Sequence, residues 1–185
     1  MTTPTTDTAT LSGSYTLDPA HTRIGFVARH AMVSKVRGSF SDFEADINLD
    51  FANPTASTAK VVIQVASIDT GQAARDEHLR TNDFFDVPAF PAWTFQSTSI
   101  ETKGNNEFAL KGDLTIKATT LPVSIDFEHI GTATDVSGNL RAGFEGKATI
   151  SRKDFGVTWN APLEAGGVLV GDKIVLELDI SAIKS

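Results

Sequence analysis

The sequence predicts an all-β protein of one domain, an antiparallel barrel of about eight strands with one short helix. Three observations lead to this fold. Apolar and polar residues alternate over most of the chain, the connections between these stretches are short and turn-like, and several stretches reach ten residues or more. Alternation with a period of two is typical of a strand with one buried face and not of a helix. Connections this short leave no room for helical crossovers, which favours antiparallel pairing.

The alternation is clearest at residues 41–51, where Phe43, Ile47 and Phe51 share one parity and acidic residues or asparagine fill the other. Turn-forming sequences rich in glycine and asparagine separate this stretch from others like it. The eight predicted strands cover residues 22–30, 41–51, 61–65, 93–95, 107–118, 123–127, 139–152 and 174–182. One helix is expected at about residues 72–82, because a run of good helix formers follows an Asp-Thr-Gly turn there.

A barrel and a sandwich both accommodate eight amphipathic strands. Small residues at bend-like positions of long strands favour coiled strands that close a barrel; these are Gly25, Gly38, Gly112, Gly143 and Gly146. We therefore expect the barrel, with the sandwich as the alternative. An eight-stranded barrel is the size that either fills its own interior or holds one slender ligand.

Composition excludes several classes of function. The 185 residues include no cysteine, which rules out disulfides, thiolate metal sites and cysteine nucleophiles. A net charge of −7 argues against a nucleic-acid partner. No apolar run reaches the roughly 18 residues that span a bilayer, so a membrane-spanning protein is not expected. Signature motifs of hydrolases, phosphate-binding loops and dinucleotide-binding turns are missing, and we expect no enzyme activity.

The first residues differ in composition from the rest of the chain. Six threonines occur among the first ten residues, and no basic start leads into an apolar signal segment. We expect a disordered tail at residues 1–13, a barrel domain at residues 14–185 and a cytoplasmic location.

Ordered blocks of sequence then resemble a known family. They are YTLDPAHT (15–22), IGF (24–26), RH (29–30), VRGSF (36–40), IDT (68–70), RDEHL (75–79), DFFDV (83–87), FP (90–91), TF (94–95), GDLTI (112–116), PV (122–123) and RKDFGV (152–157). In this order they resemble the YceI-like family over about residues 14–184. The resemblance implies an extended, lipocalin-like β-barrel with a helix, which binds polyisoprenoids or other long amphiphilic lipids in an internal pore and carries no implied catalysis. Many relatives are periplasmic, and relatives often form homodimers.

A lipid-binding barrel needs a dry, continuous interior lined by aliphatic and aromatic side chains. Twelve such residues lie on the inward side of the predicted strands: Phe26, Phe43, Ile47, Ile63, Phe95, Leu114, Ile116, Phe127, Phe144, Ile150, Leu176 and Leu178. Any one of them, taken alone, is better explained as a residue that only fills the core. The resemblance to the family favours a cavity.

Five further residues are candidates for ligand contacts, four in or near the predicted helix and one on the first predicted strand. Phe84 and Phe85 follow the helix, which we expect to cover one end of the pore with Arg75 or His78 near a polar head group. The alternative is a solvated helix with an ion pair between residues 76 and 80. His30 shares its parity with Phe26 and is a candidate inward donor or acceptor to a ligand oxygen, or else a histidine satisfied by a neighbouring carbonyl. The four histidines show no metal-ligand spacing, so we expect no metal and no cofactor.

The sequence therefore leads to two hypotheses of function. In the first, the protein is a carrier or sequestering protein whose ligand is an isoprenoid or fatty-acid-like lipid. In the second, it is a structural or stress-related interaction protein with a filled barrel and no ligand.

Overall fold

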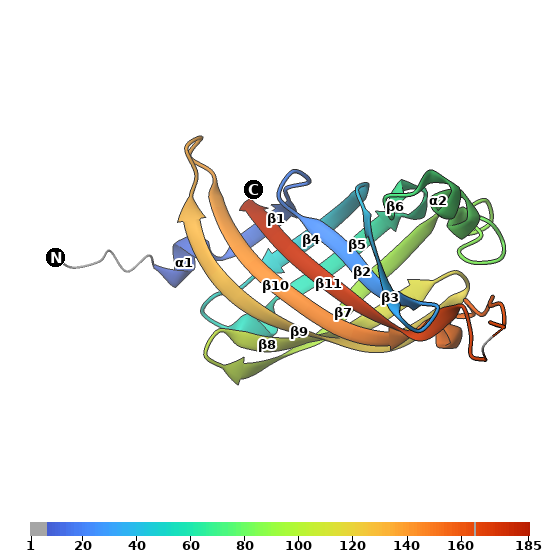
Figure 1. The fold of residues 1–185 in the computed structure, drawn as a ribbon. Helices are drawn as coiled ribbons and strands as arrows, with labels where there is room; N and C mark the ends of the chain where they lie inside the picture. The colour runs from blue at the N-terminus through green and yellow to red at the C-terminus, as the bar shows by residue number, and fades with distance from the viewer. Residues whose placement is uncertain (1–6, 165) are drawn as a thin grey trace.

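Eleven strands form one continuous sheet in the computed structural model, which describes residues 7–164 and 166–185 (Figure 1). The strands are β1 (Gly13–Leu17), β2 (Arg23–His30), β3 (Ser34–Phe40), β4 (Phe43–Leu49), β5 (Thr58–Gln64), β6 (Ile68–Asp69), β7 (Ala92–Gly104), β8 (Glu107–Ile116), β9 (Thr119–Thr134), β10 (Leu140–Ser151) and β11 (Val170–Lys184). The helices are α1 (Thr8–Leu11) and α2 (Ala73–Arg80), with short 3-10 turns at Pro54–Ala56, Val65–Ser67 and Lys153–Phe155.

The sheet closes into a barrel because β1 pairs with both β4 and β11. β1 and β2 lie end to end along β11: Leu17 is opposite Ala182, and Arg23 is opposite Asp179. In the same way β3 continues into β4 after two residues, and these strands pair with β2 and β1. The strands therefore occupy eight positions around the barrel, all joined by antiparallel pairs. The expected eight-stranded antiparallel barrel is confirmed.

Three strands and part of the N-terminal segment differ from the expectation. β1, β3 and the two-residue β6 were not among the predicted strands; in β3 the inward position between Val36 and Phe40 is a glycine, which interrupts the apolar pattern. Residues 1–6 of the expected tail lie outside the described residues. Within the rest of that segment, Thr8–Leu11 form the one-turn helix α1, and Leu11 is buried where the Tyr15 hydroxyl donates to its carbonyl oxygen. The expected helix at residues 72–82 is observed as α2.

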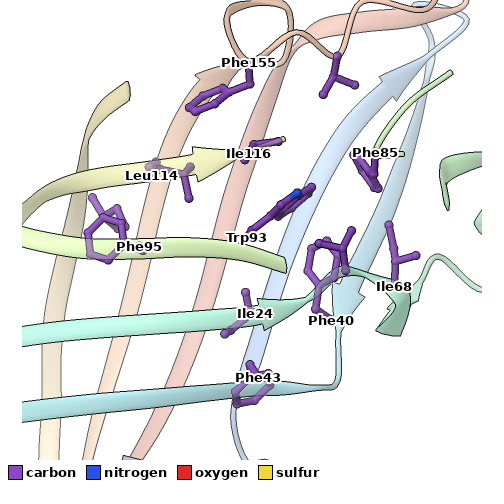
Figure 2. Packing of buried hydrophobic residues seen from close by; sticks show 14 of the residues in the cluster. Ile24, Phe40, Phe43, Ile68, Phe85, Trp93, Phe95, Leu114, Ile116 and Phe155 are labelled. Atoms are coloured by element: carbon purple, nitrogen blue, oxygen red, sulfur yellow. The ribbon is translucent and has the colours of Figure 1, made fainter. Parts of the chain in front are cut away.

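The two ends of the barrel are covered differently (Figure 1). At one end lie α2, residues 81–91 and residues 152–164 and 166–169, and we call this the α2 end. At the other end lie α1 and the β7–β8 and β9–β10 hairpins, and we call this the hairpin end. A large cluster of buried apolar side chains, which contains Trp93 and Phe155, packs on the inner side of the barrel (Figure 2). A smaller cluster surrounds Tyr15.

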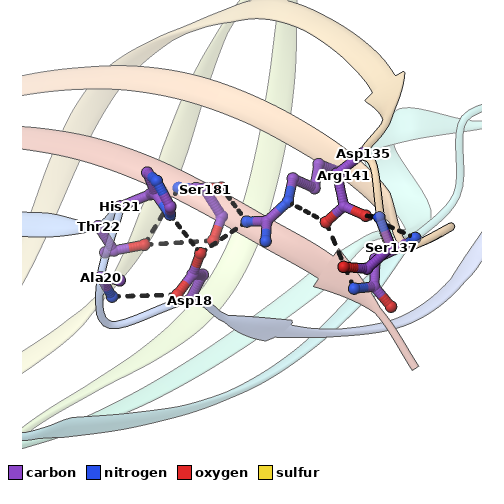
Figure 3. A network of polar contacts seen from close by, with 9 residues as sticks. Asp18, Ala20, His21, Thr22, Asp135, Ser137, Arg141 and Ser181 are labelled. Atoms are coloured by element: carbon purple, nitrogen blue, oxygen red, sulfur yellow. Dashed lines mark hydrogen bonds and ion pairs between the residues drawn. The ribbon is translucent and has the colours of Figure 1, made fainter.

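An ion-pair network joins the β1–β2 link to the β9–β10 hairpin (Figure 3). Arg141 of β10 donates from Nη1 to Asp18 Oδ2 at 2.6 Å and from Nε to Asp135 Oδ2 at 2.7 Å. Asp18 Oδ2 also lies 2.6 Å from His21 Nδ1. These bonds, with Arg141 first, lower the pKa of Asp18 to about 2, and Arg141 likewise lowers the pKa of Asp135 to about 2.

This network predicts a specific loss of stability in acid. Both carboxyls have a lower pKa in the folded state than in the unfolded chain, so their contribution is present above roughly pH 4 and is lost as the pH falls toward about 2. We expect Arg141→Gln to lower the free energy of unfolding above roughly pH 4, and the difference from the parent to shrink below it. Urea unfolding across this pH range measures the effect. Lys111→Gln, which removes the exposed pair with Glu101, is the control; the same pH dependence in the parent and in Arg141→Gln would contradict the prediction.

Candidate functional site

The barrel encloses a cavity of about 260 Å³. Side chains from all eight strand positions, from α2 and from residues 84 and 85 line it. The lining is apolar except for Ser57 and Thr58 near the hairpin end and Arg152 at the α2 end. Among the described residues, no carboxylate and no histidine lines the cavity, so the paired acids or convergent imidazoles of a hydrolytic or metal site are not found there.

Most of the residues predicted from the strand pattern meet at this cavity. Its lining includes Phe26, Ile47, Ile63, Phe84, Phe85, Phe95, Leu114, Ile116, Phe127, Phe144, Ile150, Leu176 and Leu178. Residues 84 and 85 approach it from the segment after α2, and Leu79 approaches it from α2 itself. The helix and the segment after it therefore cover one end of the cavity, as the sequence led us to expect.

Two of the predicted strand residues do not line the cavity. Phe43 is buried in the larger apolar cluster but packs into the wall beside β5, opposite Ile63. His30 is the last residue of β2 and is exposed, because β2 and β3 extend past the barrel as a hairpin there. The parity argument for an inward His30 was therefore wrong: parity holds only as far as the barrel wall extends.

The two polar candidates on α2 also lie away from the cavity. Arg75 turns back along the chain and donates to the hydroxyl and the carbonyl oxygen of Thr70, at 2.7 and 2.6 Å. His78 Nε2 lies 2.8 Å from Asp83 Oδ2, and its ring packs on Trp159. Both side chains hold the loops around α2 in place and are not near the lumen.

The alternative ion pair on α2 does not form either. Asp76 is buried and accepts from the Thr70 backbone N–H and hydroxyl. Arg80 donates to the carbonyl oxygens of Ala66 and Ile68. Both side chains fasten α2 to the preceding segment, because the helix packs against that segment and does not stand free in solvent.

Several lining residues were missed as site residues. Trp93, Phe108, Leu110, Val123 and Ile125 line the cavity and share the parity of residues that the pattern did select. The signal for Arg152 was its place two residues after Ile150, which puts it on the inward side of β10. Phe40 gave no signal, because its strand was not predicted.

Pairing of phenylalanine with glycine keeps the interior hollow. A Cβ added to Gly38 would overlap the Phe26 ring, one added to Gly112 the Phe95 ring, and one added to Gly146 the Phe127 ring. Phe26 and Phe127 are direct cross-strand partners of their glycines, and Phe95 is a diagonal one. Each ring therefore lies over a glycine, flat against the wall, and does not cross the lumen.

Arg152 is the charged group of the cavity lining, and it is only 5% exposed. Its guanidinium donates to the carbonyl oxygens of Gly171, Val157, Trp159 and Val170 at 2.7 to 3.0 Å. Burial lowers the pKa of Arg152, and the nearby Asp172 acts in the opposite direction. The positive charge is thus held mainly by backbone carbonyl dipoles.

Two buried nitrogens near the cavity have no hydrogen-bond partner among the described residues, Trp93 Nε1 and His129 Nε2. Trp93 is the second residue of β7 and lies toward the α2 end. His129 lies on β9 toward the hairpin end, with its ring centroid 5.1 Å from Phe144 and 5.5 Å from Phe51. Burial lowers the pKa of His129, which favours the neutral ring.

The helices of the described residues are too short or too polar to cross a bilayer.

Comparison with known proteins now decides the family. The family model of the YceI-like domain matches residues 15–182, almost the whole barrel. The chain belongs to the YceI-like family. A UPF0312 protein of Shewanella oneidensis is 40% identical over 151 residues, which cover 80% of this chain and 79% of that protein.

Solved structures of YceI-like proteins and related barrels share the fold. BcnA of Burkholderia cenocepacia superposes with a TM-score of 0.78 at 24% identity, covering 89% of this chain and 98% of that one. The YceI protein of Campylobacter jejuni has a TM-score of 0.74 at 30% identity, covering 85% and 90%. A polyisoprenoid-binding domain from Saccharophagus degradans has a TM-score of 0.66 at 13% identity, covering 94% and 99%.

Proposed function

We propose that the protein binds an isoprenoid or similar long-chain amphiphilic lipid inside the barrel and acts as a carrier or sequestering protein. The observation that carries the proposal is the apolar cavity of about 260 Å³ along the barrel interior. Membership of the YceI-like family and the shared fold of a polyisoprenoid-binding domain support it. A cavity of this size between the side chains also argues against the filled barrel of the alternative hypothesis.

The volume of the cavity limits the size of the ligand that it can hold. Ligand pockets usually measure about 300–1,000 Å³, so this cavity of about 260 Å³ lies just below the usual range and suits a slender chain. Burying about 400 Å² of prenyl chain at roughly 25 cal/mol per Å² supplies about 10 kcal/mol before the costs of association. Micromolar binding requires about 8 kcal/mol. Contacts with the hydrocarbon chain alone are therefore of the right magnitude.

We further propose that the protein binds its ligand without chemical change. The lining described above offers no general acid, base or nucleophile beside the ligand space, since its one charged group is an arginine hydrogen-bonded to backbone carbonyls. Incubation with a prenyl lipid, followed by extraction and mass analysis, tests this: the lipid is expected to return unaltered.

Native mass spectrometry of gently purified protein, followed by organic extraction, tests the binding itself. We expect a protein species heavier than the chain by the mass of one lipid, and a delipidated sample that takes up added farnesol. A protein that neither carries nor takes up any prenyl lipid or fatty amide would overturn the proposal. The cytoplasmic location and the homodimer remain predictions, for cell fractionation and for sedimentation analysis to test.

A further inference from the structure

Exposed apolar side chains gather at one place on the surface of the barrel. Five large apolar side chains among the described residues are exposed, and three of them, Met32, Val33 and Val168, belong to the tip of the β2–β3 hairpin and to the loop at residues 166–169. Single exposed apolar residues are ordinary, whereas a contiguous group indicates a surface that contacts another molecule. We call these three residues the tip patch.

The hairpin tip and the loop form one surface. The Ala31 N–H donates to the Leu169 carbonyl oxygen at 2.7 Å. A Cβ added to Gly167 would overlap the Met32 sulfur, so the Met32 side chain rests directly on that glycine. Val168 is the next residue, and it is exposed. The tip of the hairpin and residues 167–169 therefore lie side by side at the α2 end of the barrel (Figure 1).

The turn of this hairpin has an unfavourable backbone conformation. The Val33 N–H donates to the His30 carbonyl oxygen, and the two residues between them have positive φ, 51° at Ala31 and 63° at Met32. Asparagine and glycine usually occupy such a turn, because residues with other side chains are unfavourable in the left-handed region. A hairpin tip that met only water would gain stability from that replacement. The apolar residues at this turn therefore point to a contact with an apolar phase.

Three cations lie directly behind the tip patch, and we call Arg29, Lys35 and Lys173 the cation row. Arg29 of β2 is opposite Lys35 of β3. On the other side of β2, Lys173 of β11 continues the row, since its neighbour Ile174 is opposite Ala28. All three side chains are exposed, and no ion pair among the described residues includes any of them. Like charges opposite one another destabilise a sheet, so a positive row without a counter-ion needs an external anion to offset it.

Two acids lie close to this row along the chain, and neither pairs with it. Asp172 precedes Lys173, but it accepts from the Ser151 hydroxyl and the Lys153 N–H, so its carboxylate is held by the end of β10. Glu164 precedes the loop and is exposed, and it forms no ion pair with the row among the described residues. The charge of the cation row is therefore available to a partner, although the whole chain has a net charge of −7.

We propose that the protein docks on an anionic lipid bilayer, with Met32 and Val33 in the interfacial region and the cation row at the level of the phosphates. Burial of apolar side chains and attraction between cations and anionic lipids are the two contributions that hold a protein at a membrane surface. A second copy of the chain fits less well, because a two-fold pair through the tip would bring the cation row against itself.

The docking surface lies beside one end of the cavity. Ala28 and Val170 line the cavity, and the hairpin tip begins two residues after Ala28. The inference goes beyond the proposed lipid binding, because it names the surface at which the protein meets the bilayer that supplies or receives a lipid.

A fluorescent label reports which surface contacts the membrane. The chain has no cysteine, so Val33→Cys accepts one environment-sensitive label at the tip patch. Val136→Cys, at a fully exposed valine between β9 and β10 at the hairpin end, is the matched control. We expect vesicles of phosphatidylglycerol and phosphatidylcholine to shift the emission of the label at 33 to shorter wavelength and to leave the label at 136 unchanged.

Two results of this experiment would overturn the inference. The first is an equal shift at both positions, or no shift at 33, which would mean that the tip patch does not enter the bilayer. The second is a shift at 33 that appears without vesicles and rises with protein concentration, which would assign the tip patch to contact between copies of the chain.

Sedimentation with the same vesicles measures the contribution of the cation row. One lysine or arginine near an anionic surface changes binding by about fivefold, so Arg29→Gln combined with Lys35→Gln should weaken it at least about tenfold. Lys103→Gln combined with Lys111→Gln changes the net charge equally, but these lysines form ion pairs from β7 and β8, and this control should bind nearly as the parent does. Salt should weaken binding of the parent, and vesicles of phosphatidylcholine alone should bind it poorly. Equal weakening by the two double variants would indicate net charge alone and overturn the inference.

Docking and lipid binding fail separately. Both vesicle experiments use the protein without an added cavity ligand, so a protein that takes up no prenyl lipid can still dock. Loss of docking in the variants of the cation row, with uptake of farnesol unchanged, is the result that we expect. A protein that takes up farnesol but binds no anionic vesicle would overturn the inference and leave the proposed function standing.

Discussion

Replacing Arg152 by methionine is expected to lower the free energy of unfolding by about 3–5 kcal/mol. The guanidinium holds the carbonyl oxygens of Val157, Trp159, Val170 and Gly171. Methionine fills a similar volume but donates no hydrogen bond, so these oxygens lose their partner where water has little access. The segment at residues 152–159 is then no longer fastened to the start of β11, and the α2 end of the cavity loosens.

Urea unfolding at neutral pH measures this loss. Arg152→Lys is expected to recover only a small part of it, because one ammonium cannot reach four carbonyls that a planar guanidinium spans. Arg29→Met, at an exposed arginine of the neighbouring β2, serves as the control and should change little. An unfolding midpoint for Arg152→Met equal to that of the control would refute the structural role.

Gly146→Val is expected to reduce lipid uptake by at least about tenfold while the barrel stays folded. A side chain at this position overlaps the Phe127 ring, which can move only off the wall and into the cavity. The overlap should also lower the free energy of unfolding by about 1–3 kcal/mol, the usual range for overpacking. Native mass spectrometry with added farnesol measures the uptake.

Gly131→Val is the matched control. Gly131 lies on the neighbouring strand β9, and a Cβ there meets nothing within 4 Å. Its uptake should match that of the parent, apart from a small effect of strand propensity. If both valine variants take up farnesol as the parent does, the ring of Phe127 does not limit the cavity.

The barrel was predictable because nearly every strand has one dry and one wet face. Residues 43–49 show the alternation without a break, residues 107–116 show it with one glycine among four large apolar residues, and the structure has strands at both positions. Among the strands that were missed, β3 has a glycine where the pattern needs an apolar side chain, and the ring over that glycine, Phe26, comes from another strand. Local sequence does not record such a contact.

The cavity was less predictable than its wall. Strand parity correctly predicted eleven residues of the lining, but parity does not distinguish a filled core from a hollow one. His30 and Arg75 were wrong for a related reason: chemical type pointed to a ligand contact, while the end of the barrel and the backbone of Thr70 determined where these side chains lie. Trp93 was visible as a core residue, but its unpaired N–H emerges only from three-dimensional packing.

The phenylalanine–glycine pairs have one more consequence. Gly38, Gly112 and Gly146 are absent from the cavity lining, although each decides where a lining ring rests. The width of the cavity therefore depends on three glycines that do not line it and that a bound lipid does not contact. Alanine at one of these positions would push the phenylalanine ring into the cavity and narrow it. Ligand specificity can therefore change while every residue that contacts the ligand stays the same.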